Sequence, residues 1–161
     1  MTETLAQTGA KAPAFDMPGA GGASHRLSDH AGRIVVLYFY PKADTSGCTK
    51  QALAFTELAD AFAEAGAVVI GVSKDPVKKL DRFVEKHGLT VPLASDAEGD
   101  LCERYGTWVQ KSMYGKTYMG IERATFLIDG EGVLRREWRK VKVPGHVEEV
   151  LDAVRSLPAR D

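Results

Sequence analysis

The sequence has little cysteine, only two residues in 161. Small chains that depend on a disulfide framework carry several pairs of cysteines, so this class is excluded. The segment Cys48-Thr49-Lys50-Gln51 also lacks the second sulfur of a Cys-x-x-Cys pair, which argues against a dithiol oxidoreductase. The low cysteine content instead favours a protein of a reducing compartment, and we expect a cytoplasmic location.

An excess of charge of either sign is also missing. The chain has 21 Lys and Arg against 22 Asp and Glu, a formal net charge of −1, so electrostatics gives no reason to expect nucleic acid or an anionic membrane as a partner. No apolar run approaches the length of a membrane span. The start Met1-Thr2-Glu3-Thr4 lacks the basic region and apolar core of a signal peptide. We therefore expect no membrane association.

Patterns for metal or phosphate binding are absent as well. The four histidines do not pair at metal-ligand spacing; they are His25, His30, His87 and His146. The glycine-rich run at 18–23 follows no core strand and lacks the Lys-Ser/Thr that closes a P-loop, so a hairpin turn is the better interpretation. The sequence predicts no metal and no bound cofactor.

What the sequence does contain is a strand, a turn and a helix around Cys48. The apolar run 34–40 predicts a buried strand, which Pro41 ends because proline has no N–H for the next ladder bond. Residues 42–47 favour turns, and apolar residues then recur at three- and four-residue steps, as in a helix. Cys48 is therefore expected in the first turn of a helix that follows a core strand.

This position suits sulfur chemistry. The free N–H groups and the positive dipole end of a helix stabilise an anion. A helix N-terminus or a nearby cation lowers the pKa of a thiol from about 8.5, so that thiolate becomes the main form. The alternative is a small buried hydrophobe, as many free cysteines are. The turn, the preceding strand and Thr45 favour a nucleophile at Cys48.

The rest of the chain alternates between predicted strands and helices after a short edge strand at 14–17. These elements are a strand at 67–73, a helix at 76–87 capped by Asp75, a strand at 90–94, a short helix from a capping box at 95–98 to 105, a loop-like insert at 107–120, a hairpin at 123–138 and a helix from Pro144. The order predicts an α/β fold with a mixed central β-sheet flanked by helices and an N-terminal β-hairpin extension, in which the early strands are parallel. Residues 1–161 are expected to form a single domain.

The order Pro41-x-x-x-Thr45-x-x-Cys48 resembles the peroxidatic motif of the peroxiredoxins. The stretch from Tyr38 to Lys50 is most similar to the bacterioferritin comigratory protein, or PrxQ, branch of that family, and the similarity extends over roughly residues 10–157. It implies a thioredoxin-like fold and a thiol-dependent peroxidase that reduces hydrogen peroxide and organic hydroperoxides in antioxidant defence. It also implies a monomer or a loose dimer.

The resemblance gives roles to four residues. Cys48 would attack the peroxide, Thr45 would contact the thiolate and the peroxide, and Pro41 would shield the sulfur from water. Arg123, directly before Ala-Thr-Phe-Leu-Ile-Asp, would reach the sulfur with a planar fork of donors. From the residues alone, Thr45 can equally cap the helix, Pro41 can simply end the strand, and Arg123 can be a solvated strand end.

The chain departs from the family in its second cysteine. Many relatives have a resolving cysteine five residues after the peroxidatic one, where this chain has Leu53, and the alternative helix at 75–87 has none either. Two routes therefore remain for reducing the sulfenic acid of Cys48. Either an external thiol (thioredoxin, glutaredoxin or a small thiol) attacks it, or Cys102 is an atypical resolving residue. We favour the external thiol, because a cysteine beside Leu101 on a short helix is typical of packing. A redox sensor without peroxidase activity is the non-enzyme alternative.

Overall fold

A computed structural model describes residues 6–157. The first four residues, from which we expect no signal peptide, lie outside the described part. Two short 3-10 helices accompany the main elements. The helices and strands are β1 (Asp16–Pro18), β2 (Ser24–Arg26), β3 (Ile34–Phe39), α1 (Ser46–Glu57), α2 (Ala59–Glu64), β4 (Ala67–Ser73), α3 (Val77–His87), β5 (Leu93–Ser95), α4 (Leu101–Arg104), β6 (Trp108–Met113), β7 (Lys116–Ile121), β8 (Ala124–Ile128), β9 (Leu134–Trp138) and α5 (His146–Ser156).

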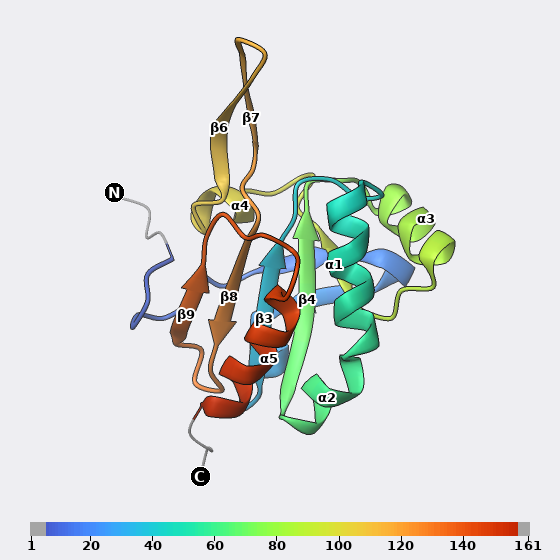
Figure 1. Cartoon of the computed structure of the whole chain (residues 1–161). Coiled ribbons are helices and arrows are strands. Elements are labelled where there is room, and N and C mark those ends of the chain that lie inside the picture. The colour runs from blue at the N-terminus through green and yellow to red at the C-terminus, as the bar shows by residue number, and fades with distance from the viewer. Residues whose placement is uncertain (1–5, 158–161) are drawn as a thin grey trace.

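The central sheet has five strands in the order β5-β4-β3-β8-β9 (Figure 1). Strand β3 is parallel to β4, and β4 is parallel to β5, whereas β8 and β9 continue the sheet in antiparallel pairs. All residues of β3 except Ile34 are buried, as expected for a central strand with a continuous apolar run. The prediction of a mixed α/β sheet with parallel early strands is confirmed.

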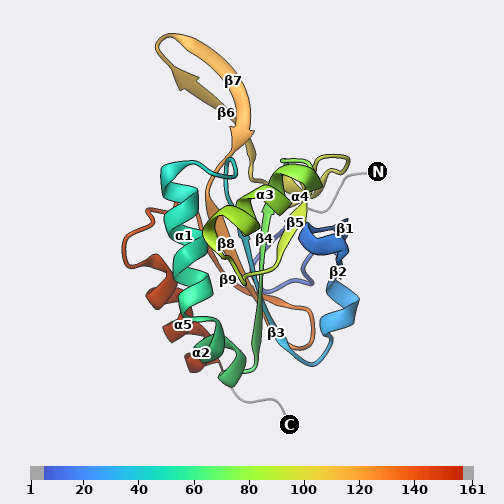
Figure 2. The ribbon, with the colours of Figure 1, turned by 90° about the vertical axis from the view of Figure 1, so that its right-hand side faces the viewer.

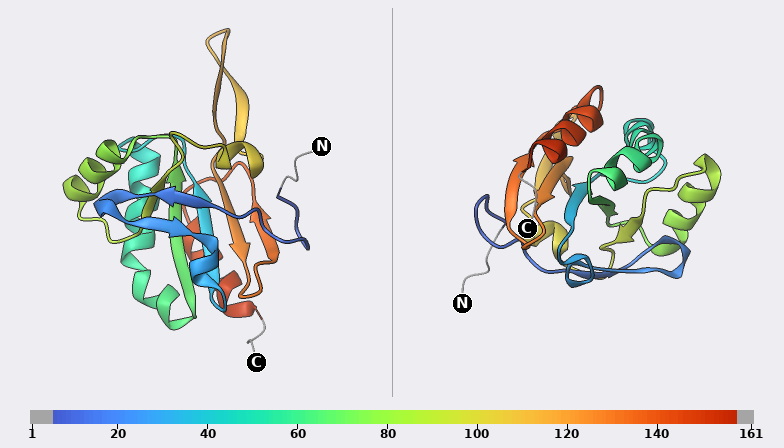
Figure 3. Two further views of the ribbon diagram at one scale, coloured as in Figure 1. Left: turned by 180° about the vertical axis from the view of Figure 1, so that it is seen from behind. Right: turned by 90° about the horizontal axis from the view of Figure 1, so that it is seen from below.

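The sheet separates two hydrophobic layers. One face packs against α1, α2, α3 and α5, and the other packs against the N-terminal segment and α4. Figure 3 shows the helical layer and the N-terminal hairpin on opposite sides of the sheet. Because side chains alternate along a strand, Val36 and Tyr38 of β3 point into the helical layer, whereas Val35, Leu37 and Phe39 point into the other.

The N-terminal hairpin extension is also confirmed, with β1 and β2 pairing antiparallel from Asp16 opposite Arg26. Strand β5 is shorter than predicted because it begins only after Pro92. The helix after Cys48 is interrupted at Leu58, where ψ is 13°, and α2 follows. Within residues 6–157, none of the helices is both long and apolar enough to cross a membrane.

The prediction of a loop at 107–120 is wrong, because β6 and β7 form a hairpin in which Trp108 pairs with Ile121. This hairpin projects from the body of the molecule (Figures 1 and 2). Its two-residue turn has positive φ at Tyr114 (54°) and Gly115 (78°), as hairpin turns of this length require. Tyr-Gly is not the usual sequence signal for such a turn, and most of both strands is exposed, so the alternation that marks a half-buried strand is absent.

The predicted cap of α3 is also wrong. The helix begins at Val77 with Pro76 as its N-cap residue, one residue later than predicted. The buried carboxylate of Asp75 instead accepts hydrogen bonds from the backbone N–H of Ala43 at 2.7 Å and from the hydroxyl of Ser73 at 2.8 Å. Asp75 therefore attaches the turn after β3 to the end of β4.

Two further helices start later than the sequence predicts. Helix α4 begins at Leu101, because the carboxylate of Asp96 accepts the N–H groups of Leu101 and Cys102 at 3.0 and 2.9 Å. Helix α5 begins at His146 rather than Pro144. In both cases the residue types that favour a helix start lie in the preceding loop.

His146 is buried at the start of α5. Its Nε2 lies 2.8 Å from the Oγ1 of Thr125 on β8, and its ring packs edge-on against Trp138. Burial lowers the pKa of His146 and outweighs the opposing effect of Glu149, while Arg123 lowers the pKa further. The neutral imidazole is therefore the form that the fold favours.

This burial predicts a loss of stability in acid. Because the pKa of His146 is below its ordinary value of 6.5 only in the folded chain, the unfolded chain binds more protons below that pH. The effect of His146 on the free energy of unfolding should be absent above pH 6.5. As the pH drops from 6.5 through the pKa of His146 in the folded chain, the free energy of unfolding should fall. Urea titrations across this range should show a shallower decline for His146→Gln than for the wild type. Equal slopes would contradict this prediction.

Candidate active site

Cys48 is the third residue of α1 and only 1% exposed. Thr45 precedes the helix in an extended conformation (φ −91°, ψ 159°) and is its N-cap residue. The first N–H groups of a helix have no intrahelical partner and carry the positive end of the helix dipole. The sulfur therefore lies where the backbone stabilises negative charge, as the strand-turn-helix pattern predicts.

The structure brings the guanidinium of Arg123 to Cys48, although the two residues are far apart in the sequence. Nη2 of Arg123 donates to Sγ of Cys48 at 3.3 Å, and Nη1 donates to Oε1 of Gln51 at 2.6 Å. The backbone carbonyl of Arg123 accepts the N–H of Val141 at 3.0 Å. Arg123 is thus held at both ends, and its planar fork spans two residues of one helix face.

Gln51 is a site residue that the sequence reasoning missed. It is fully buried, and its Nε2 has no hydrogen-bond partner within the described residues. The signal was available, because Gln51 follows Cys48 by three residues and shares its buried helix face with Ala52 and Phe55. An amide at a core position of a helix needs a partner, and here that partner is Arg123.

Gly47 contributes by having no side chain. A Cβ at this position would lie 3.2 Å from Nη2 of Arg123, which is tighter than an ordinary van der Waals contact. Its φ is not positive, so the reason for glycine here is the approach of the guanidinium rather than backbone conformation. Gly47 therefore leaves the space through which Arg123 reaches Cys48.

Thr45 is exposed, and its hydroxyl donates to the carbonyl of Lys42 at 2.8 Å. Its side chain makes no helix-capping bond, so the capping alternative is wrong for this structure. Within the described residues, Oγ1 has no hydrogen bond to the sulfur either. Because its proton is engaged with Lys42, the lone pairs of Oγ1 are available to accept a hydrogen bond.

Pro41 is half-buried and follows the last residue attached to the sheet, since the N–H of Tyr40 still bonds to the carbonyl of Val72 at 3.1 Å. The neighbouring hydroxyls of Tyr38 and Tyr40 are buried and have no hydrogen-bond partner within residues 6–157. Burial raises the pKa of both phenols, so each keeps its proton. The floor under the cysteine turn is therefore aromatic and contains two protonated phenols.

The turn itself is attached to the end of α3. Asp44 has a left-handed backbone (φ 64°), and its carboxylate pairs with Nε2 of His87 at 2.8 Å and Nζ of Lys86 at 2.9 Å. Hydrogen bonds from His87 and then Lys86 lower the pKa of Asp44. No local sequence pattern indicates this contact, because more than 40 residues separate its partners.

Cys102 lies on the other side of the molecule from Cys48. Its side chain belongs to the layer formed by α4 and the N-terminal segment, whereas Cys48 belongs to the helical layer, so the central sheet stands between them. Burial, followed by the negative charge of Asp96, raises the pKa of the Cys102 thiol. A disulfide requires Cα atoms within roughly 7 Å, and both cysteines are free.

No group of three or more His, Cys, Asp or Glu side chains that could hold a metal ion occurs in the described part of the chain. The groups gathered at Cys48 are instead hydrogen-bond donors and one cation. Such a site can hold an anionic sulfur and can stabilise negative charge on an atom bound beside it.

Comparison with known proteins identifies the family of this chain. The model of the AhpC/TSA family matches residues 8–137. Peroxiredoxin Bcp of Bacillus subtilis is 48% identical over 151 residues, covering 94% of this chain and 96% of that protein. The structure of a cysteine-to-serine mutant of Xylella fastidiosa PrxQ superposes with a TM-score of 0.90 at 38% identity, covering 95% of this chain and 98% of that one.

A third relative, the bacterioferritin comigratory protein of Xanthomonas campestris, has been solved in trapped intermediate and ligand complexes that concern its alkyl peroxide reduction. It has a TM-score of 0.84 at 44% identity, covering 88% of this chain and 90% of that one. These neighbours confirm the thioredoxin-like fold expected from the sequence. The chain therefore belongs to the AhpC/TSA family, in its Bcp/PrxQ branch of peroxiredoxins, and is a thiol peroxidase.

Proposed function

We propose that Cys48 is the peroxidatic residue of this enzyme and that Arg123, Thr45 and Pro41 complete its active site. The substrates are hydrogen peroxide and organic hydroperoxides. An external thiol, either a protein such as thioredoxin or a small thiol, returns the oxidised sulfur to the thiol. The observation that carries this proposal is the 3.3 Å contact from Nη2 of Arg123 to Sγ of Cys48 at the start of α1.

Two sources of positive charge act on the sulfur. The guanidinium of Arg123 stays charged at any physiological pH and donates directly to Sγ. The N-terminus of α1 adds the partial charge of its free N–H groups. Gln51 fixes the orientation of the guanidinium through Nη1, so Nη2 remains directed at the sulfur without further loss of side-chain entropy in the reaction.

In the reaction, the thiolate of Cys48 attacks one peroxide oxygen and the O–O bond breaks. The sulfur becomes a sulfenic acid, and the departing oxygen takes the electron pair and a proton to leave as water or an alcohol. Arg123 can donate to that oxygen as charge moves onto it. Thr45, whose proton is engaged by the carbonyl of Lys42, accepts the O–H of the bound peroxide and so fixes its direction.

Pro41 covers the sulfur from the side of β3. Only 1% of Cys48 is exposed, and exclusion of water strengthens each electrostatic contact in the site. Proline suits this position because it also removes an N–H that would otherwise need a partner.

The absence of a second thiol on the Cys48 side of the sheet supports reduction by an external thiol. It is also consistent with a reducing compartment, and we place the enzyme in the cytoplasm as a monomer in which residues 1–161 form one domain. Cys102 then acts as a packing residue of α4 rather than as a resolving cysteine.

The proposal predicts that the two cysteines differ completely in their effect on activity. Cys48→Ser should abolish peroxide consumption by the purified protein in the presence of a thiol reductant, whereas Cys102→Ser should retain it. A Cys48→Ser protein that consumes peroxide at the wild-type rate would exclude the peroxidatic role. Retention of the fold, checked by circular dichroism, separates loss of chemistry from loss of structure.

Arg123→Ala should reduce the second-order rate constant for oxidation of Cys48 by roughly a hundredfold, the usual effect of removing one donor to a developing charge. The rate constant of Arg123→Lys should lie between those of the wild type and Arg123→Ala, because lysine keeps the charge but cannot bridge Sγ and Gln51. Arg155→Ala, on the exposed side of α5, is the matched control. Thiolate absorbance at neutral pH should decrease in Arg123→Ala, and an unchanged rate and absorbance would remove Arg123 from the site.

Introducing a second sulfur on α1 should change the product of Cys48 oxidation. Leu53 is 40% exposed and five residues after Cys48, about 7.5 Å along a helix axis, so a bond requires the first turn of α1 to open. After one equivalent of peroxide, non-reducing mass spectrometry should find an intramolecular disulfide in Leu53→Cys but only sulfenic acid in the wild type and in Leu53→Ser. A disulfide between Cys48 and Cys102 in the wild type would overturn the external-thiol cycle.

A further inference from the structure

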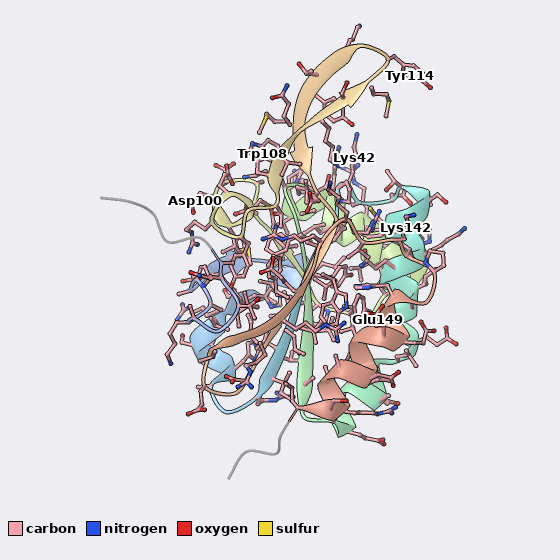
Figure 4. All side chains as sticks on the ribbon, turned by 60° about the vertical axis from the view of Figure 1, so that its left-hand side comes forward. Lys42, Asp100, Trp108, Tyr114, Lys142 and Glu149 are labelled. Atoms are coloured by element: carbon pink, nitrogen blue, oxygen red, sulfur yellow. The ribbon has the colours of Figure 1, made fainter. Side chains whose placement is uncertain are left out.

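Beside the cysteine turn lies a cavity of about 530 Å³, between residues 42–45 and α3. Figure 2 shows α3 next to the start of α1, and Figure 4 shows Lys42 at the end of the body from which the hairpin β6–β7 projects. Its lining includes the side chains of Lys42, Thr45, Lys79, Arg82, Phe83 and Lys86. The cavity volume falls within the range of small-molecule sites.

The lining of the cavity is strongly cationic. It contains three lysines and one arginine against one carboxylate, that of Asp44, in a chain whose formal net charge is −1. Asp44 is already paired with Lys86 and His87. Lys42, Lys79 and Arg82 form no ion pair with any carboxylate in residues 6–157. Three positive charges therefore face the cavity without an internal counter-charge.

The cavity is also continuous with the surroundings of the reactive sulfur. Thr45 lines it and immediately precedes α1, three residues before Cys48, which lies in the first helical turn. The ring of Phe83 packs against Tyr40, with centroids 6.4 Å apart, and both rings belong to the same core cluster as Cys48. A ligand in the cavity is therefore adjacent to the segment that carries the sulfur.

We propose that this cavity binds the reductant, and that the reductant is a low-molecular-weight thiol bearing carboxylates, of about the size of a tripeptide. The inference rests on the peroxidatic role proposed for Cys48. Arg82 offers a bidentate site for one carboxylate, and Lys79 and Lys42 supply charge for another. Protein partners typically bury about 800 Å² on each side of an interface, whereas a cavity of this volume accommodates a small molecule.

The reaction balances with two equivalents of the thiol. The first thiolate attacks the sulfenic sulfur of Cys48, forming a mixed disulfide and breaking the S–O bond; the oxygen leaves as water, with the sulfenic proton and the proton that the thiol lost when it ionised. The second attacks the outer sulfur of the mixed disulfide, which leaves Cys48 as a thiolate and forms the disulfide of the small thiol. Because Cys48 is only 1% exposed, the turn that joins the cavity to the sulfur must move aside for the first attack.

The test separates the reductive step from peroxide reduction. In a Cys102→Ser background, Cys48 is oxidised with one equivalent of peroxide and then mixed with glutathione or with its diethyl ester, which lacks both carboxylates. The formation of the mixed disulfide is followed by rapid-quench mass spectrometry. The test protein is the double variant Lys79→Gln/Arg82→Gln. The matched control is the double variant Lys116→Gln/Arg155→Gln, at two exposed positions outside the cavity.

Glutathione should react about three- to tenfold faster than its diethyl ester with the parent protein and with the control, as expected for two partly exposed charge contacts. The preference should disappear in the Lys79/Arg82 variant and in high salt. Equal rates for the two thiols with the parent protein, or an undiminished preference in the Lys79/Arg82 variant, would overturn the site. Reduction of the oxidised Cys48 by thioredoxin, but by neither of the two small thiols, would also overturn the site. If Cys48 forms no sulfenic acid, the peroxidatic role itself fails, and this outcome is measured before any thiol is added.

Discussion

The proposed active site depends on one guanidinium that binds two residues of a helix at once. Arg123 donates to Cys48 through Nη2 and to Gln51 through Nη1, so the sulfur and the amide fix the orientation of the cation between them. Gln51 is fully buried and accepts a charge-assisted hydrogen bond. The same contact therefore satisfies a polar core residue and places positive charge at the sulfur.

The central sheet explains how residues 75 positions apart in the sequence meet. Strand β8 pairs antiparallel with β3, and Ala124, the neighbour of Arg123, lies opposite Phe39 near the end of β3. The chain leaves β3 at this edge, turns at Pro41 and enters α1. The strand register thus delivers Arg123 to the first turn of the helix, and Asp75 and Asp44 attach the intervening turn to β4 and α3.

The sequence predicted those features that depend on local patterns. The buried run of β3, the helix start near Cys48 and the β8–β9 hairpin follow from apolar periodicity and turn residues. The cation required a family resemblance, since nothing local distinguishes Arg123 from a solvated strand end. The partners of Asp75, Asp44 and Gln51 come from other elements. The β6–β7 hairpin lacks the alternation of apolar and polar residues that predicts a strand, because most of both its strands faces solvent. Contacts of this kind require the tertiary fold.

The sheet between the two cysteine layers has a consequence for the lifetime of the oxidised enzyme. A sulfenic acid with no intramolecular thiol to trap it persists until an outside thiol arrives, and a second peroxide that arrives first converts it to sulfinic acid, which thiols do not reverse. In the proposed cycle, the ratio of thiol to peroxide around the protein therefore decides between turnover and permanent inactivation. Under a peroxide burst, the inactivated fraction becomes a chemical record of the dose.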